Sequence, residues 1–524
     1  MKRIINSLTA LLAASVLFSC SDDLLDIKNP NALTTGDFWL TQSDVELGVN
    51  ALYNTFYAAG SWNRYLHWRL DLLSDEGYSV SPMVESSNWT RFIYNNYNHD
   101  SNQTFIYNLC YRSIFRANQV LTYASDIEFD TQENKNAALG QAYFLRGYNY
   151  FHLAVLWEEV CLVNTIQNPG DKPLQGTVEQ VWAQVEEDLK AASDLLPEEW
   201  TGDKKGRFTK GAALAQLARA YLQQKKYKEA KDALYWMVEG EGKKYYGLVE
   251  NFYDNFSEKT ENNIESVFEI QMSDAISSTE MNPAGESKTS SVGHQRSYIF
   301  GLKGVGARDG LARPWLVDVF KQERTIDGKL DPRLRVSLLY KDLASDFPDD
   351  ESGKFYGKTW EDGKWGNDVY FRKYSRDAWK KFEGLREDRT NPMNIRVIRY
   401  SDVLLMYAEC LNELGYTSEA CWYVDCVRQR AGMARLEDAM PEVANDKDKF
   451  FERLQIERVL ELNGECVRWF DIKRWGLGET EEGLKALQNR DPDFLNYIPG
   501  KSFRQPLPSS EVLNNPNMHQ LKGY

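Results

Sequence analysis

Apolar residues recur at helical spacing over much of the N-terminal half of the chain. Between residues 178 and 196, for example, Val181, Val185 and Leu189 share one helical face, and Pro197 follows as a stop signal. Such a stripe predicts an amphipathic helix that packs against a core. By the same criterion we expect helices at residues 38–57, 104–125, 136–156, 178–196, 209–224 and 227–239.

Two regions lose this helical period. Residues 58–104 are rich in Asn, Ser, Tyr and Trp, and residues 240–395 contain many Gly, Ser, Asn, Asp and Trp. Within the second region, Glu265 to Met272 alternates between polar and apolar residues, which predicts a short strand. Long segments without helical period inside a compact protein are often functional. We therefore expect two loop-rich inserts on a helical frame.

Helical periodicity returns near the C-terminus. It predicts helices at residues 399–414, 418–431 and 447–474, whereas the Pro-rich tail after residue 494 is expected to be extended. Leu217 to Leu222, followed by Tyr227 and Ala230, is similar to a tetratricopeptide unit, and Tyr407 to Ala420 is a second such segment. The predicted fold is therefore mainly α, with tetratricopeptide-like helix pairs, loop-rich inserts and a few short strands.

The first residues predict export and lipidation. Lys2 and Arg3 precede an apolar run that is too short for a stable membrane span, and Cys20 follows where cleavage is expected. This arrangement is typical of a bacterial lipoprotein; the alternative is a plain signal peptide with an incidental cysteine. We expect residues 1–19 to be the signal peptide and residues 20–36 a tether whose acyl chains on Cys20 hold the protein at a membrane.

Composition narrows the kinds of partner and ligand that this protein can bind. The net charge of −15 argues against nucleic acid as a partner and against adhesion to anionic lipid. Aromatic residues make up 13% of the chain, with 15 Trp and 29 Tyr, and such side chains suit sugar rings and protein interfaces. The six cysteines other than Cys20 show no metal-binding spacing, so we expect buried free thiols.

Recognisable catalytic or metal-binding motifs are missing from the sequence. None of the five His are spaced as ligands on one helix, and no nucleophile elbow, phosphate loop or dinucleotide fingerprint occurs. The sequence therefore predicts a protein that is not an enzyme and has no metal site. The run from Asp342 to Glu351 leaves weak calcium binding open, although a solvated acidic loop is the preferred interpretation.

The two loop-rich regions instead suggest a binding surface for sugars. Aromatic rings pack on the C–H faces of sugars, while carboxylates and guanidinium groups fix the hydroxyls. Loop packing is the competing explanation for any single residue. The candidate glycan-binding residues are Trp62, Asp71, Asp75, Trp89, Tyr298, Trp360, Trp365 and Arg372.

Several longer motifs resemble the SusD/RagB family. They include the stretch from Arg399 to Glu409, the segment from Val427 to Gly432, and the segment from Glu457 to Gly476, which contains Arg468-Trp-Phe-Asp. The tail from Pro506 to Tyr524 also matches, although Leu521-Lys522 departs from the family's usual ending. The resemblance spans essentially the whole mature chain.

This resemblance implies a fold, a location and a partner. It implies a SusD-like helical fold with an N-terminal region at 37–240, a ligand-binding insert at 241–395 and a C-terminal region at 396–524. It also implies a surface-exposed outer-membrane lipoprotein that captures oligosaccharide and delivers it to a SusC-like TonB-dependent transporter. In the scaffold, Arg399, Asp402, Glu457 and Arg468 are expected to form buried ion pairs. An adhesin-like structural subunit and a surface glycoside hydrolase are the alternatives.

Overall fold

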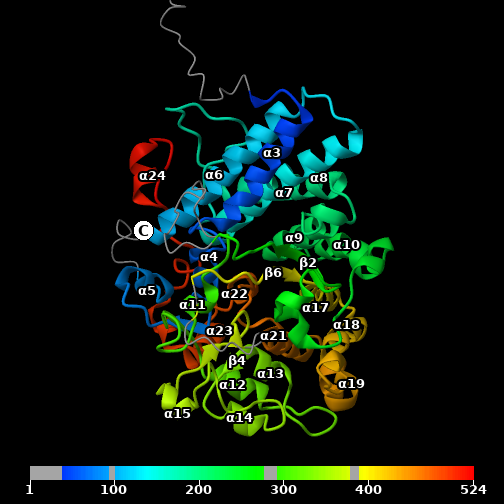
Figure 1. The fold of residues 1–524 in the computed structure, drawn as a ribbon, viewed down its shortest axis with the longest axis vertical. Helices are drawn as coiled ribbons and strands as arrows, with labels where there is room; N and C mark the ends of the chain where they lie inside the picture. The colour runs from blue at the N-terminus through cyan, green and yellow to red at the C-terminus, as the bar shows by residue number, and fades with distance from the viewer. Residues whose placement is uncertain (1–37, 94–100, 277–291, 378–386, 388) are drawn as a thin grey trace, which may run out of the picture.

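The computed structural model describes residues 38–93, 101–276, 292–377, 387 and 389–524. The chain forms three groups of helices (Figure 1). The N-terminal group comprises α3 (Gln42–Tyr53), α6 (Ser101–Tyr123), α7 (Gln132–Leu156), α8 (Val178–Leu195), α9 (Lys210–Gln223) and α10 (Tyr227–Val238). The C-terminal group comprises α17 (Tyr400–Glu413), α18 (Thr417–Arg430), α19 (Leu436–Ala439), α20 (Pro441–Ala444), α21 (Lys447–Leu462), α22 (Arg468–Trp475) and α23 (Glu481–Arg490). The last helix, α24 (Ser509–Asn514), lies apart from them, beside α6 (Figure 1).

The third group consists of short helices from the two regions that lack helical period. They are α4 (Tyr65–Leu72), α5 (Val84–Thr90), α11 (Arg296–Ile299), α12 (Trp315–Phe320), α13 (Arg333–Ser337), α14 (Leu343–Asp346) and α15 (Trp360–Gly363). Helices α12 to α15 form the lower end of the molecule in Figure 1, opposite the long helices α3, α6, α7 and α8. Within the described part of the chain, no helix is both long and apolar enough to cross a bilayer.

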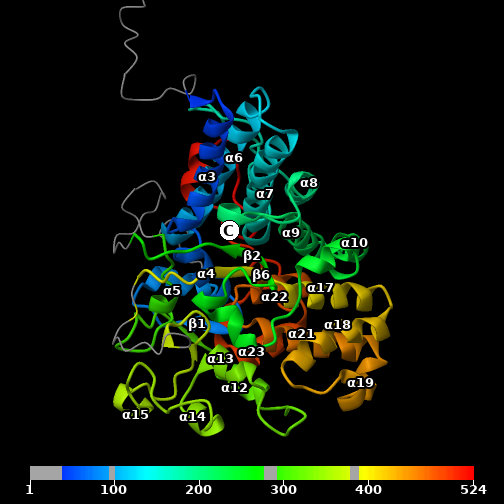
Figure 2. The same cartoon turned by 45° about the vertical axis from the view of Figure 1, so that its right-hand side comes forward.

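A row of helices runs through the frame. Helices α6, α7, α8, α9, α10, α17 and α18 each pack against the next one in this order. Figure 2 shows the row passing from the upper end toward the side that carries α10 and α18. Because α10 packs on α17, the row connects the N-terminal and C-terminal groups across the long insert between them. The predicted helical-pair scaffold is therefore confirmed.

Local sequence explains where these helices begin and how closely they pack. Thr41 and Thr177 cap α3 and α8 through capping boxes, in which the Thr side chain and the side chain three residues later satisfy free backbone N–H groups. Between α7 and α8, a Cβ atom at Gly147 would lie 2.9 Å from Cγ of Leu189. Glycine at this position therefore permits the close helix contact.

The described strands form three two-stranded antiparallel sheets. Strand β1 (Gly77–Ser79) pairs with β3 (Gly310–Ala312), β2 (Ser266–Ile270) with β6 (Ile395–Arg399), and β4 (Leu338–Leu339) with β5 (Tyr370–Phe371). The strand expected from Glu265 to Met272 is β2, so that prediction is confirmed.

Three local predictions were wrong. The region 58–104 contains α4, β1 and α5; all eight residues of α4 are buried, so this helix has no polar face and shows no helical period. The helix expected over 447–474 is two helices, because Gly464 and Cys466 both adopt positive φ between α21 and α22. The tail contains α24 rather than being extended throughout.

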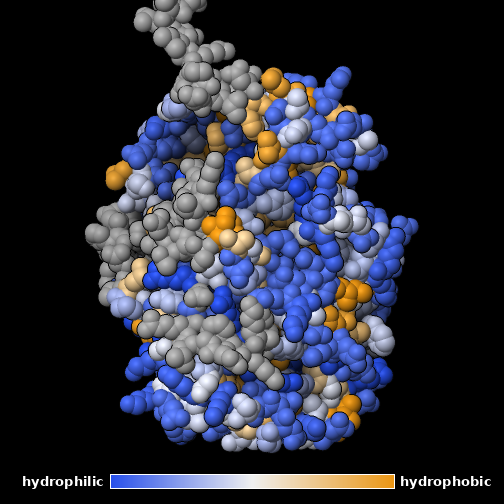
Figure 3. Space-filling model, in the orientation of Figure 1, coloured by the Kyte–Doolittle hydropathy of each residue, from blue (hydrophilic) through white to orange (hydrophobic). Residues whose placement is uncertain are grey.

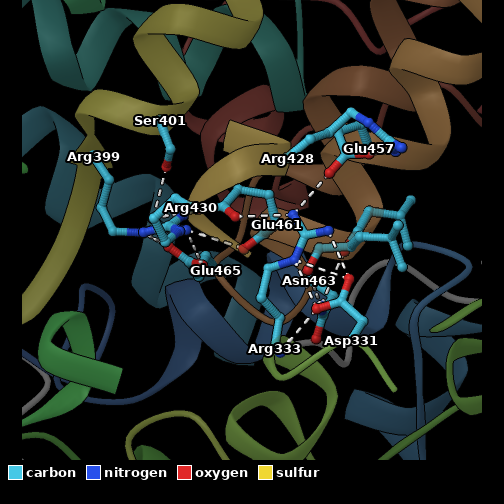
Figure 4. Close-up of polar contacts among 12 residues, drawn as sticks. Asp331, Arg333, Arg399, Ser401, Arg428, Arg430, Glu457, Glu461, Asn463 and Glu465 are labelled. Carbon is cyan, nitrogen blue, oxygen red and sulfur yellow. Dashed lines mark hydrogen bonds and ion pairs between the residues drawn. The ribbon is translucent and has the colours of Figure 1, made fainter. Parts of the chain in front are cut away.

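Buried ion pairs join the C-terminal helices to the rest of the molecule (Figure 4). Glu457 and Glu461 lie one turn apart on α21, and each accepts from more than one arginine. The buried pairs expected for Arg399, Asp402, Glu457 and Arg468 are confirmed. They are Arg399–Glu461 (2.7 Å), Arg219–Asp402 (2.7 Å), Arg333–Glu457 (2.8 Å) and Arg468–Asp75 (2.7 Å).

Candidate functional site

The two loop-rich regions meet at the sheet formed by β1 and β3. Tyr78 lies opposite Leu311 in its register, and the N–H of Val80 donates to the carbonyl of Asp309 at 2.9 Å. At the other end of β1, the backbone N–H of Arg313 donates to the carbonyl of Glu76 at 2.8 Å. We call residues 76–80 and 309–315 the β1–β3 junction. Here segments that are more than 200 residues apart in the sequence form one continuous surface.

Two partly buried aromatic rings lie at the β1–β3 junction, each beneath an arginine. The guanidinium carbon of Arg313 lies 3.9 Å from the ring centroid of Tyr78, and that of Arg490 lies 4.8 Å from the ring of Trp315. The indole N–H of Trp315 donates to the carbonyl of Asp75 at 2.6 Å, which fixes the ring. Aromatic faces held in place next to cationic donors suit a polyhydroxylated ligand.

Charged groups of both signs surround Tyr78. Burial raises the pKa of its phenol, and the charges of Asp368, Arg313, Arg308 and Asp491 act on the same group. Arg313 pairs with Asp491, and with Asp493 at 2.7 Å. Burial also raises the pKa of Asp491 to about 7, against the opposing charge of Arg313. The β1–β3 junction therefore offers both donors and acceptors for hydroxyl groups.

All three polar candidates from the sequence form ion pairs within the protein. Asp71 is buried and accepts from Arg296 at 2.5 Å. Asp75 is buried between Arg468 (2.7 Å) and Arg490 (3.2 Å). Arg372 is buried against Glu351 at 2.5 Å and Asp377 at 3.1 Å. These contacts give each residue a structural role, and the proposed role in glycan binding stays a prediction.

The aromatic candidates are mostly core residues. Trp62 is 3% exposed, and its indole N–H donates to the Tyr148 hydroxyl at 2.7 Å. Trp89 is buried, with the Arg69 guanidinium 4.3 Å from its ring centroid. The structure brings Trp360 and Trp365 together, with ring centroids 5.3 Å apart, but both are buried.

One aromatic candidate is partly exposed. Tyr298 lies on α11, and the guanidinium carbon of Arg389 is 5.1 Å from its ring centroid. The Tyr298 carbonyl accepts from the N–H of Ala307, two residues before the β1–β3 junction. The role of Tyr298 in binding stays a prediction. Cys20, the predicted lipidation site, lies outside the described residues.

Sequence reasoning missed Arg313, Asp491 and Asp493 as parts of this surface. The two aspartates follow Arg313 by nearly 180 residues and lie around η8 (Pro492–Asn496), a short helix with no periodic pattern. The Asp-Pro-Asp sequence indicates a turn and gives no evidence of which residues it contacts.

The cysteines have the state that the sequence predicts. Five of the six cysteines in the described part are buried free thiols and Cys426 is partly buried, which confirms the expected thiols.

Among the described residues, no group of three or more His, Cys, Asp or Glu is arranged to hold a metal ion. Within the acidic run, Asp346 accepts from Tyr340 at 2.7 Å and Glu351 pairs with Arg372. Weak calcium binding by this run stays a prediction.

Comparisons with known proteins agree on one family. Residues 23–222 match a family described as starch-binding and associating with the outer membrane, and residues 264–524 match the SusD family. SusD-like protein P2 of Formosa agariphila is 27% identical over 98% of both chains.

Solved structures share the fold. A SusD superfamily protein from Bacteroides vulgatus has a TM-score of 0.76 and 25% identity, covering 93% of this chain and all of that one. A protein named as a laminarin-binding SusD-like protein has a TM-score of 0.71 and 23% identity, with the same coverage. The match extends over both halves of the sequence and over the fold as a whole, so the chain belongs to the SusD/RagB family.

Proposed function

We propose that this protein is a non-enzymatic, lipid-anchored outer-membrane protein that binds an oligosaccharide and delivers it to a SusC-like TonB-dependent transporter. The observation that carries the binding role is the β1–β3 junction, where Tyr78 and Trp315 lie partly exposed beneath Arg313 and Arg490. Family membership supports oligosaccharide as the ligand class, since one structural relative is named for binding laminarin.

The proposed outer-membrane location and the proposed transporter partner are supported by the N-terminal sequence and by family membership. The basic start, the short apolar run and Cys20 support a lipid anchor. The family that matches residues 23–222 is described as associating with the outer membrane. A Cys20→Ser variant of the full chain is expected to leave the membrane fraction. Affinity purification of the anchored protein from its native outer membrane tests for the transporter.

Calorimetric titration with laminari-oligosaccharides and malto-oligosaccharides tests the binding role. Stacking on one ring contributes about 1 kcal/mol, so Tyr78→Ala and Trp315→Ala should each weaken binding about fivefold. Trp422→Ala is the matched control, because Trp422 is 56% exposed on α18 and lies outside the β1–β3 junction. Unchanged affinity in both junction variants would reject this site, and release of shorter sugars during the titration would favour a hydrolase.

A further inference from the structure

A separate cavity lies beside the start of α9. It is open to solvent on one side and is lined by the α8–α9 connection, by the end of η5 (Glu241–Tyr245), and by β2 and the segment that leads into it. Its volume is about 140 Å³. An engineered protein cavity of about 150 Å³ holds one benzene molecule, and this pocket is open to solvent, so part of a six-membered sugar ring can enter it while the rest of the ring and its substituents stay in solvent. None of its lining residues belongs to the β1–β3 junction.

Aromatic side chains form two walls of this cavity and are held in fixed positions. The indole N–H of Trp200 donates to the carbonyl of Phe208 at 2.7 Å. The hydroxyl of Tyr245 donates to Oε2 of Glu198 at 2.9 Å. Trp200 and Tyr245 are both partly exposed, so a ligand can reach them without unfolding the core. Rings fixed in this way lose little conformational entropy when a flat apolar face packs on them.

The third wall is polar and depends on an unusual backbone conformation. Asn262 has φ 51°, in the left-handed region, and its N–H donates to both carboxylate oxygens of Glu269 at 3.1 Å. The Ser266 hydroxyl donates to Oε2 of Glu269 at 2.6 Å. Glu269 is buried and also accepts from the side-chain N–H of Asn394 at 2.8 Å, so its carboxylate is occupied by protein donors and holds this wall in place.

The charges of the lining residues indicate a neutral ligand. Glu198, Glu199 and Glu269 line the pocket together with Lys205 and Arg207, so there is no excess of positive charge to attract a phosphate. A divalent cation is also disfavoured, because the Glu198 and Glu269 carboxylates already accept hydrogen bonds from protein groups. We propose that this cavity is a second binding site that accepts one neutral pyranose ring. The ligand class extends the proposed function, but the site does not depend on the β1–β3 junction.

The indole N–H resonance of Trp200 provides a direct test. In full-chain protein with ¹⁵N-labelled tryptophan, this resonance can be assigned through Trp200→Phe, and that of Trp315 through Trp315→Phe. Titration with methyl β-glucopyranoside and methyl α-glucopyranoside at millimolar concentrations should shift the Trp200 resonance saturably. Tyr245→Ala should weaken this binding about fivefold. Tyr235→Ala, at an exposed tyrosine of α10, is the matched control and should leave it unchanged.

The two resonances separate the two claims. A Trp315 shift without a Trp200 shift would overturn the second site and leave the proposed function in place. A Trp200 shift without a Trp315 shift would support the second site and count against the β1–β3 junction. If neither resonance shifts with either glycoside, the second site is rejected. Equal weakening by Tyr235→Ala and Tyr245→Ala would also reject it, and tighter binding of glucose 6-phosphate would contradict the inferred neutral ligand.

Discussion

Arg399 Nη1 and Glu461 Oε1 lie 2.7 Å apart in the interior of the protein, and both side chains are completely buried. Arg399 also pairs with Glu265 at 2.5 Å and with Glu465 at 2.7 Å. Through Glu265 this one guanidinium connects the end of β6 to the segment before β2. Through Glu461 and Glu465, which Figure 4 labels, it connects β6 to α21 and to the residues after it. Isolated charges are expensive to bury, so such a cluster is stable only while all its members are present.

Removal of one charge from this cluster should destabilise the fold strongly. In Glu461→Gln, Arg399 and Arg430 each lose one negatively charged partner. Loss of one partner of a buried ion pair typically costs about 3–5 kcal/mol of unfolding free energy. Urea unfolding measures this loss. Asp232→Asn is the control, since Asp232 pairs with Lys228 at 2.6 Å on the surface, where a pair is worth at most about 1 kcal/mol. Equal losses in the two variants would contradict a stabilising role for the buried cluster.

The same cluster should make stability depend on acid pH. Burial opposes ionisation of Glu457, but the guanidinium groups of Arg333, Arg453 and Arg428 outweigh it and lower the pKa to about 2. A carboxyl group with a lowered pKa stabilises the fold above its unfolded pKa, here 4.5, and this contribution disappears as the pH falls toward about 2.

Glu457→Gln should therefore differ from the natural protein most at neutral pH. The difference in unfolding free energy should be constant above about pH 5 and should shrink as the pH falls further. Thermal and urea unfolding across this range measure it. A difference that does not depend on pH would show that the pKa of Glu457 is the same in the folded and the unfolded protein, so that the arginines do not lower it.

Periodicity predicted amphipathic helices such as α8 and α10, each of which has one buried apolar face and one solvated face. It could not predict α4, which is buried on every side, or the break between α21 and α22. Across that break, apolar and charged residues continue at helical steps, and the interruption depends on the backbone conformations of Gly464 and Cys466. Tertiary packing decides these conformations, and a sequence pattern contains little information about them.

The break itself gives a prediction. Gly464 has φ 67°, and a Cβ atom there would lie 2.8 Å from Cδ1 of Phe371. Gly464→Ala should therefore combine left-handed strain of about 1–2 kcal/mol with a further overpacking cost of about 1–3 kcal/mol. Gly476→Ala is the control, because φ is 66° there and nothing lies within 4 Å of the added Cβ. Urea unfolding should show the larger loss for Gly464→Ala, and equal losses would exclude the steric contribution.

The candidate site was harder to predict than the fold. Aromatic residues in polar segments suggested exposed rings. Trp62 is nevertheless buried, and its indole N–H donates to the hydroxyl of Tyr148, 86 residues later in the sequence. A hydrogen-bond partner so far away can bury a tryptophan whose neighbours in the sequence are polar. Among the described residues on the face shown in Figure 3, most are hydrophilic and the hydrophobic ones form small separate groups, so no large apolar patch of these residues marks a binding site.

Substitution of Trp365 distinguishes a structural from a binding role for the buried aromatic candidates. Trp365 is 2% exposed, packs against Trp360 and donates from its indole N–H to the carbonyl of Lys303 at 3.0 Å. Removal of a buried tryptophan side chain costs about 3–5 kcal/mol, so Trp365→Ala should lower the unfolding free energy by this amount. Trp422→Ala, at a residue that is 56% exposed, should change it by less than about 1 kcal/mol.

At temperatures where Trp365→Ala stays folded, its affinity for laminari-oligosaccharides and malto-oligosaccharides should equal that of the natural protein. Weaker binding without a loss of stability would instead identify Trp365 as part of the glycan site.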